Sequence, residues 1–266
     1  ADHAGTGERN GHLNPRQIAV SRWQLTGLGL AAYALGLIAT APATLIDAQL
    51  ERASAGGLRL ADASGTLWSG TGQIEIRDAN RSTGVAKHIA WRFRPEHLLR
   101  GRLFYEVRLD HAPRHFPLTV SATRIEVEGA NINLPAATLG LGVPKLAPLG
   151  LTGDMLLHIA RLSFGRGTIQ GNATLQWRGA GSAFTRISPL GDYELRFEGE
   201  GAAVRASLRT LQGPLQLDGQ GSWTSGRNPQ FQGSARVPPQ QQQQLSPLLR
   251  MIAVDQGEGR FELLLR

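Results

Sequence analysis

Apolar and polar residues alternate along most of the second half of the chain. In residues 169–177 the odd positions are apolar or small, whereas the even positions are polar. A period of two places successive side chains on opposite faces of a β-strand. The same pattern predicts eleven strands, over residues 73–77, 89–93, 103–109, 118–127, 155–164, 169–177, 193–197, 204–208, 215–223, 231–237 and 261–265. A sheet with one solvated polar face and one buried apolar face is typically antiparallel, so we predict an all-β fold.

Glycines occur inside several of these predicted strands. They occupy apolar-face positions, at Gly171, Gly219, Gly221 and Gly233. They could mark bulges and bends that curve the sheet strongly, as in a sandwich or half-barrel. They could instead leave room for a neighbouring aromatic ring such as Trp177 or Trp223. We favour curvature, and therefore predict a strongly curved, sandwich-like antiparallel sheet.

Helical periodicity is scarce among the β patterns. Residues 95–100 could form one turn, and residues 240–254 carry leucines at helical spacing, which predicts one short C-terminal helix. Residues 139–150 are rich in glycine and proline, and we expect them to connect two layers or lobes. A sub-division of the β domain near 139–150 would follow.

Residues 23–46 contain no charged side chain. A helix of this length covers the roughly 30 Å of a bilayer core, so we predict a transmembrane helix over 23–46. The alternatives are a cleaved signal peptide, with Ala39-x-Ala41 or Ala41-x-Ala43 as the cleavage site, and a buried helix of a soluble protein. The predicted organisation is a segment over 1–22, the membrane span over 23–46 and a β-rich domain over 47–266.

Charge predicts the orientation of this span. Arg16 and Arg22 precede it, whereas Asp47 and Glu51 follow it. Basic residues remain on the cytoplasmic side, and Trp23 stands where an interfacial ring belongs. We therefore expect a cytoplasmic N-terminus and a β domain on the outer side.

A stripe of small residues recurs along the predicted span, at Ala32, Gly36, Ala39 and Ala43. Small residues allow another helix to approach closely, so the stripe is a candidate packing face. The alternative is that alanine is simply common in bacterial anchors.

Composition offers little chemistry. The chain has no cysteine, which excludes disulfides, thiol nucleophiles and cysteine metal sites. It also lacks a His-Glu-x-x-His pattern, a Gly-x-Ser-x-Gly elbow and a phosphate-binding loop. We therefore predict no enzyme, no catalytic or metal residues and no cofactor.

Charged residues cluster in two places. Carboxylates gather at Asp192, Glu194, Glu198 and Glu200, on the polar face of a predicted strand, where a solvated face is favoured over acid/base work. Basic residues gather in the region 87–124, in a chain of net charge +7. Because an outward-facing domain meets little nucleic acid, we expect no nucleic-acid partner. A solvated basic face is favoured over binding to acidic lipid or an acidic protein.

Several motifs carry a family resemblance when they are taken together and in order. They are Ser64-Gly-Thr-Leu-Trp-Ser-Gly-Thr-Gly72, Trp91-Arg-Phe-Arg-Pro95, Leu98-Leu-Arg-Gly-Arg-Leu103, Pro189-Leu-Gly-Asp-Tyr-Glu-Leu195 and Leu208-Arg-Thr-Leu-Gln-Gly-Pro-Leu-Gln-Leu-Asp-Gly219. The chain resembles the type II secretion system protein N family. The structural residues of these motifs are Gly65, Thr66, Leu67, Trp68, Gly70, Gly191, Asp192 and Tyr193. We expect Gly65 and Gly70 to bracket a short strand whose Trp68 anchors the sheet edge over the core.

The resemblance implies a single-pass protein of the Gram-negative inner membrane with a periplasmic β domain. It would be a non-enzymatic part of the machinery that exports folded proteins across the outer membrane. Its partners would be the other platform and periplasmic subunits of that system. A second hypothesis is an anchored β-groove that binds or transfers lipid or glycolipid. An inner face filled by the chain's own side chains would favour the first hypothesis, and an open apolar trough the second.

Overall fold

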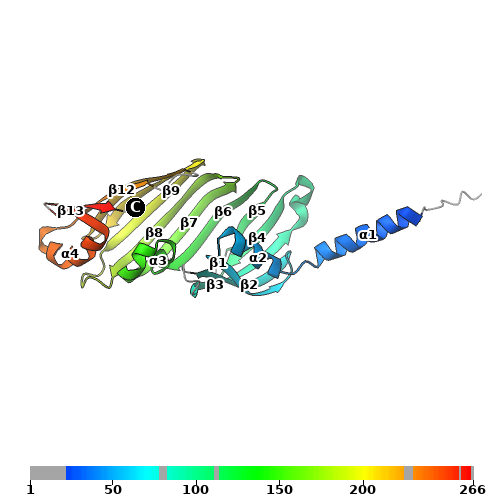
Figure 1. Cartoon of the computed structure of the whole chain (residues 1–266), viewed down its shortest axis with the longest axis horizontal. Coiled ribbons are helices and arrows are strands. Elements are labelled where there is room, and N and C mark those ends of the chain that lie inside the picture. Colours follow the sequence, from blue (N-terminus) through cyan, green and yellow to red (C-terminus); the bar gives the residue numbers. More distant parts are fainter. Residues whose placement is uncertain (1–21, 78–82, 111–113, 225–229, 258, 265–266) are drawn as a thin grey trace, which may run out of the picture. The chain divides into compact units, whose positions relative to one another are not determined.

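The computed structural model describes residues 22–77, 83–110, 114–224, 230–257 and 259–264 (Figure 1). The chain divides into two units, Ala1–Thr40 and Ala41–Arg266. The first unit contains the helix α1, Arg22–Ala39. Its large apolar side chains are exposed, among them Trp23, Leu30 and Tyr33.

The predicted transmembrane helix over 23–46 is not supported. Within the described ranges, no helix has both the length and the apolar character needed to cross a membrane. Helix α1 ends at Ala39, seven residues before the predicted end. Pro42 gives the reason, because the residue before a proline is driven out of the helical region.

Residues 41–43 belong to the second unit. The backbone N–H of Leu67 donates to the Ala41 carbonyl (2.8 Å), and Pro42 forms a β-bridge with Thr66. Ala43 is buried beside Leu60. A second helix then begins, α2 over Thr44–Ala53. Ala43, a member of the predicted packing stripe, therefore lies outside α1 and in a core.

One antiparallel sheet forms the second unit. Its strands are β1 (Leu58–Gly65), β2 (Ser69–Arg77), β3 (Thr83–Arg94), β4 (Leu103–Leu109), β5 (Phe116–Val120), β6 (Arg124–Pro135), β7 (Leu151–Gly165), β8 (Thr168–Ser182), β9 (Gly191–Gly201), β10 (Ala203–Gln212), β11 (Gln216–Thr224), β12 (Gln230–Arg236), β13 (Ala253–Gly257) and β14 (Arg260–Leu264). The strands lie side by side in chain order, except that β14 separates β12 from β13. The prediction of an antiparallel β fold with a short C-terminal helix is confirmed. The described strands form a single sheet, so a sandwich of two sheets is not confirmed.

Some strands were missed in the sequence. Strand β1 was not predicted because a register shift between Ala61 and Ser64, with Asp62 at φ 50°, interrupts its alternation. The predicted strand 118–127 is two strands, since the chain turns after Val120 and resumes at Arg124. Residues 253 and 254, predicted as the end of the C-terminal helix, belong to β13 (Ala253–Gly257) instead.

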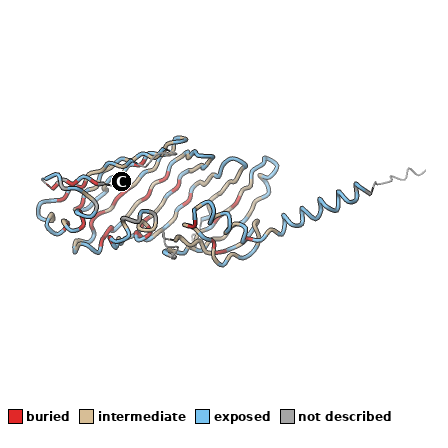
Figure 2. The backbone as a smooth tube through the Cα atoms, viewed as in Figure 1, coloured by how far each residue is buried: buried red, intermediate tan, exposed pale blue. Residues whose placement is uncertain are grey.

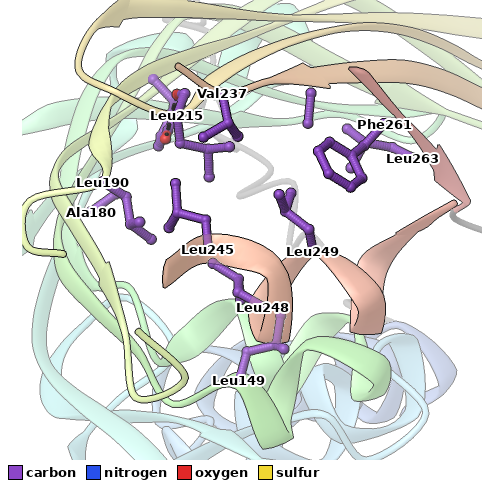
Figure 3. Packing of buried hydrophobic residues seen from close by; sticks show 12 residues of the cluster. Leu149, Ala180, Leu190, Leu215, Val237, Leu245, Leu248, Leu249, Phe261 and Leu263 are labelled. Carbon is purple, nitrogen blue, oxygen red and sulfur yellow. Dashed lines mark hydrogen bonds between the residues drawn. The ribbon is translucent and has the colours of Figure 1, made fainter. Parts of the chain in front are cut away.

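Short helices stand between the strands. They are η1 (Pro95–Arg100), α3 (Thr138–Gly142), η2 (Pro144–Leu149) and α4 (Pro239–Ile252), where η denotes a 3-10 helix. Helix α4 places Leu245, Leu248 and Leu249 against the sheet, each at most 3% exposed. The sheet arches around these leucines (Figure 3).

Contacts across the α4 cluster show how strongly the sheet curves. The cluster joins Ala180 of β8 to Leu263 of β14. Five strand spacings separate β8 from β14, roughly 24 Å in a flat sheet. The sheet must therefore curl to bring both strands around one helix.

One face of the sheet, here called the inner face, carries the apolar residues along its whole length. Buried residues alternate with exposed ones along the strands (Figure 2). Four clusters lie on this face, and shared side chains such as Phe116, Phe197 and Trp177 connect them. Helix α2 covers the cluster at the β1 end with Ile46 and Leu50, and α4 fills the cluster at the other end.

The glycines in the strands have two different roles. Gly171 has φ +115°, and its partner Leu162 comes two residues after Ala160, where the register of β7 shifts, so a neighbouring bulge explains it. A Cβ at Gly221 or Gly233 would lie within 2.9 Å of the Phe231 ring, and Gly219 meets the same ring. Curvature therefore explains Gly171, whereas packing against an aromatic ring explains the other three glycines.

Candidate interaction surfaces

The outer edge of β1 is covered by helix α2. The backbone N–H of Leu58 donates to Ser54 Oγ (2.9 Å), and that of Leu60 donates to Asp47 Oδ1 (2.8 Å). The N–H of Ala43 donates to the Gly65 carbonyl (3.3 Å). Main-chain donors that an edge strand would leave free are thus satisfied within the chain.

At the other end of the sheet, β13 is the last of the described strands. Strand β13 pairs with β14 on one side, and no described strand pairs with it on the other. Val254, the second residue of β13, is 46% exposed. An unpaired strand edge presents a row of backbone donors and acceptors to another chain. Sequence reasoning missed this edge, because it assigned residues 253 and 254 to a helix and predicted no strand over 255–257.

A cluster of strand residues occupies the middle of the inner face. Only Ala130, Ile159 and Ala173 are buried in it. Its larger members are half-buried, namely Phe116, Val127, Ile132, Leu157, Leu162 and Phe197. Unlike the two end clusters, this strand-only cluster includes no helix residue.

The first group of family-motif residues forms the β1–β2 turn. Gly65 has φ +93°, which favours glycine, and a Cβ there would lie 2.8 Å from the Gly70 Cα. Thr66 Oγ1 accepts from the N–H groups of Trp68 and Ser69 (both 3.3 Å). The predicted Thr-Leu-Trp strand is therefore a turn.

Two tryptophans hold this turn on the inner face. Trp91 Nε1 donates to the Thr66 carbonyl (3.1 Å), and its ring fills the space above Gly70. The half-buried Trp68 ring packs on Phe93, with centroids 4.9 Å apart. Leu67 binds Ala41 as described above. These residues act as a structural corner.

The second group of family-motif residues lies at the start of β9. Asp192 Oδ1 accepts from the Gly179 N–H (2.7 Å), and Oδ2 accepts from Gln212 Nε2 (2.6 Å). Tyr193 is buried and its hydroxyl donates to the Leu215 carbonyl (2.9 Å). Burial, with the charge of Asp192 adding to it, raises the pKa of the Tyr193 hydroxyl well above its ordinary value.

Gly191 is required by close approach. A Cβ there would lie 2.7 Å from the Gln212 carbonyl oxygen and 2.9 Å from the Tyr193 hydroxyl oxygen. This corner packs into the α4 cluster, whereas the β1–β2 turn belongs to the α2 cluster. The structure does not bring the two groups together into one site.

The predicted carboxylate cluster forms ion pairs on the face opposite Tyr193. Glu194 is buried, and Oε1 accepts from Arg196 Nε (2.7 Å) and from Arg209 Nη2 (2.7 Å). Burial acts to raise the pKa of Glu194, but these two arginines more than offset it and lower the pKa below its ordinary value. Glu200 pairs with Arg205, and Glu198 is exposed. A carboxylate that two arginines hold in its ionised form is suited to a structural role.

The basic region 87–124 is partly paired. Lys87 Nζ lies 2.8 Å from Asp110 Oδ2, and Arg94 Nη2 lies 2.9 Å from Glu106 Oε2. The hydrogen bond from Arg94 lowers the pKa of Glu106, and the bond to Glu106 raises that of Arg94. The exposed Arg100 and Arg102 at the β3–β4 turn form no ion pair with a described residue.

The remaining predicted residues lie in α1. Ala32, Gly36 and Ala39 are exposed there, and a Cβ at Gly36 would meet nothing within 4 Å. Their role as a packing face stays a prediction. In the described part of the chain, no group of three or more His, Asp or Glu side chains could hold a metal ion.

Comparison with known proteins identifies the family. The sequence model of the family described as "Type II secretion system (T2SS), protein N" matches residues 56–263. The chain has no match among the curated proteins or the solved structures compared with it. The matched residues include both motif groups and run from just before β1 into β14. The chain therefore belongs to the type II secretion system protein N family.

Proposed function

We propose that this secretion-system component acts without catalysis, as an assembly subunit that joins its sheet to a partner through the β13 edge. The difference between the two sheet edges carries the proposal. The N–H groups of Leu58 and Leu60 in β1 donate to Ser54, at the end of α2, and to Asp47 within it, whereas no described strand pairs with the outer side of β13. Natural proteins protect exposed edges, so an edge left open suits strand addition by another chain.

The distribution of reactive groups supports a non-enzymatic role. Glu194, the buried carboxylate of the predicted cluster, is held between two arginines on the outer face. The inner face is apolar and is filled at both ends by the chain's own helices. An inner face filled by the chain's own side chains is the arrangement expected of a scaffold, and these two ends of the sheet have it. The proposed partners are platform and periplasmic subunits of the same secretion system, with the β domain in the periplasm at the inner membrane.

The test is co-purification after Val254→Lys. A lysine in an edge strand opposes strand addition, and Val254 is 46% exposed, so folding should tolerate it. Val143→Lys is the matched control, since Val143 is 40% exposed and lies outside the sheet. We expect Val254→Lys, and not Val143→Lys, to lose the secretion subunits that co-purify with the unmodified chain. Equal recovery by both variants would contradict the proposal.

Lipid binding is the second candidate function. The strand-only cluster favours it, because its large side chains are half-buried and no helix residue belongs to it. Ile125 and Phe164, which pair across β6 and β7, are 44% and 41% exposed. If this candidate is right, native mass spectrometry will detect bound lipid in the unmodified chain, and Leu162→Gln will abolish it. A chain that releases no lipid on organic extraction would contradict it.

A further inference from the structure

The β3–β4 turn exposes two leucines from the 3-10 helix η1. In η1, Leu98 is 51% exposed and Leu99 is 99% exposed. Pro95 occupies the first turn of η1, where its missing N–H is tolerated, and Gly101 ends it at φ 68°. The family-motif segment Leu98-Leu-Arg-Gly-Arg-Leu103 is thus a projecting tip, and none of the structural roles above accounts for its leucines.

Contacts at its base fix this tip. The His97 ring packs on Phe104, with centroids 4.8 Å apart. The backbone N–H of Gly101 donates to the Leu98 carbonyl (2.9 Å), and that of Arg102 donates to the His97 carbonyl (3.4 Å). A leucine that is held outward by an ordered turn is available for burial against something else.

Two arginines follow the leucines in the chain. Arg100 and Arg102 are exposed, and neither forms an ion pair with a described residue. Glu106 is already engaged by Arg94. Glu96 is the remaining carboxylate of η1, so the charge of the tip itself is positive.

The neighbouring turns extend the same surface. In an antiparallel sheet in chain order, the β3–β4, β5–β6 and β7–β8 turns lie along one rim. Ile125 and Phe164 lie beside the latter two turns and are both more than 40% exposed. Exposed apolar residues therefore recur along the rim that carries Leu98 and Leu99.

We propose that this tip docks on an anionic membrane surface, with Leu98 and Leu99 inserted at the level of the lipid headgroups. Arg100 and Arg102 would bind lipid phosphates, which match the guanidinium fork. Apolar side chains flanked by cations are the pattern of interfacial binding, which combines apolar burial with attraction to acidic lipids. A protein groove suits the tip less well, because it would have to desolvate both arginines along with the leucines.

A reporter on the tip tests this proposal in the full chain. Glu96 precedes Leu99 by three residues, and side chains at i and i+3 eclipse in a 3-10 helix. Because the chain has no cysteine, Glu96→Cys gives a single labelling site that keeps both leucines and both arginines. An environment-sensitive fluorophore there reports the surroundings of the tip alone, whatever else attaches the protein to the vesicle.

The vesicles contain phosphatidylcholine, either alone or with phosphatidylglycerol, and a lipid-linked quencher. We expect quenching of the residue 96 reporter on phosphatidylglycerol vesicles and little on phosphatidylcholine alone. Adding Leu98→Ser with Leu99→Ser should lower the ratio of inserted to exposed reporter at least ten-fold. Removing one arginine, as in Arg102→Gln, should lower it about five-fold.

Ala137→Cys is the matched control. Ala137 is exposed at the β6–β7 connection, on the opposite rim of the sheet, and its reporter should stay unquenched. Equal quenching at 96 and 137, or none at 96, would overturn the proposal. A reporter at 96 that is shielded only when solubilised secretion subunits are added would also overturn it, in favour of a protein partner.

Discussion

A helix packs against the inner face at each end of the sheet, but the two helices have different roles. Helix α2 has no buried residue, and the polar side chains of Asp47 within it and Ser54 just after it bind the edge of β1. Helix α4 buries three leucines under the inner face, and no described strand pairs with the outer side of β13. The comparison shows that filling a core and closing an edge are separate tasks. Because α2 closes only the β1 edge, another chain could extend the sheet by pairing with the β13 edge.

The largest expected effect concerns the helix that fills the core. Leu249 is fully buried in α4, so Leu249→Ala should lower the free energy of unfolding by about 3–5 kcal/mol. Leu50→Ala in α2 is the matched variant, and its half-buried side chain predicts a loss of about 1 kcal/mol. Urea unfolding measures both. Similar losses would contradict the division of labour between the helices.

The β1 end depends on aromatic packing in place of buried helix leucines. Trp68 is half-buried against Phe93, so Trp68→Ala should cost about 2–3 kcal/mol, while Trp68→Phe should retain most of the stability. Thermal unfolding followed by circular dichroism measures the difference. A Trp68→Ala protein of unchanged stability would show that this turn does not anchor the sheet.

Opening the closed edge should have a moderate effect. Asp47→Ala removes the acceptor for the N–H of Leu60, a residue that is 4% exposed, and should cost about 1–2 kcal/mol. It should also promote association, because it uncovers an edge donor. Light scattering at increasing concentration detects this. A fully monodisperse Asp47→Ala protein would indicate that α2 does not protect the edge.

Glu194, which lies in β9 between the two ends of the sheet, should make the stability of the fold depend on pH. The pKa of Glu194 in the folded state is lower than the ordinary glutamate value of 4.5. At pH values above 4.5, the ionised Glu194 therefore stabilises the fold. This contribution should be lost as the pH falls from about 4.5 through the lowered pKa.

Glu194→Gln removes that dependence. It should cost about 1 kcal/mol at neutral pH, because Arg196 and Arg209 are half exposed and can turn to water. Below the lowered pKa, its stability should approach that of the unmodified chain. Parallel stability curves for the two proteins from pH 7 to pH 3 would refute the assignment.

The smallest expected effect on stability is at the open edge. Val254→Lys should change the free energy of unfolding by at most about 0.5 kcal/mol, since Val254 is exposed and no described strand covers it. Urea unfolding measures this. A large loss would mean that the edge is already packed within the chain.

Much of the fold could be predicted from local pattern, but the edges could not. Alternation in residues 169–177 survives because one face of β8 is apolar throughout. It fails in β1, where the bulge after Ala61 shifts the parity, and at residues 121–123, where a turn forms without glycine or proline. The bond between Asp47 and Leu60 joins residues thirteen apart, and the exposed β13 edge depends on β14 pairing with β12. Neither leaves a periodic signal.

The apolar segment 23–46 illustrates the same limit. Its composition predicted one helix, but Pro42 and the bonds from Ala41 and Ala43 to the β1–β2 turn end α1 early. Long-range pairing therefore decided the boundary. The family motifs were more informative, because they mark two corners that the whole sheet requires.

Site-specific cross-linking in intact cells tests the central claim most directly. The chain has no cysteine, so Val254→Cys on the open edge and Arg59→Cys on β1 each carry one photo-cross-linker. The open edge predicts a discrete product with another secretion subunit from residue 254 and none from residue 59. Products from residue 59 alone, or none from either residue, would contradict it.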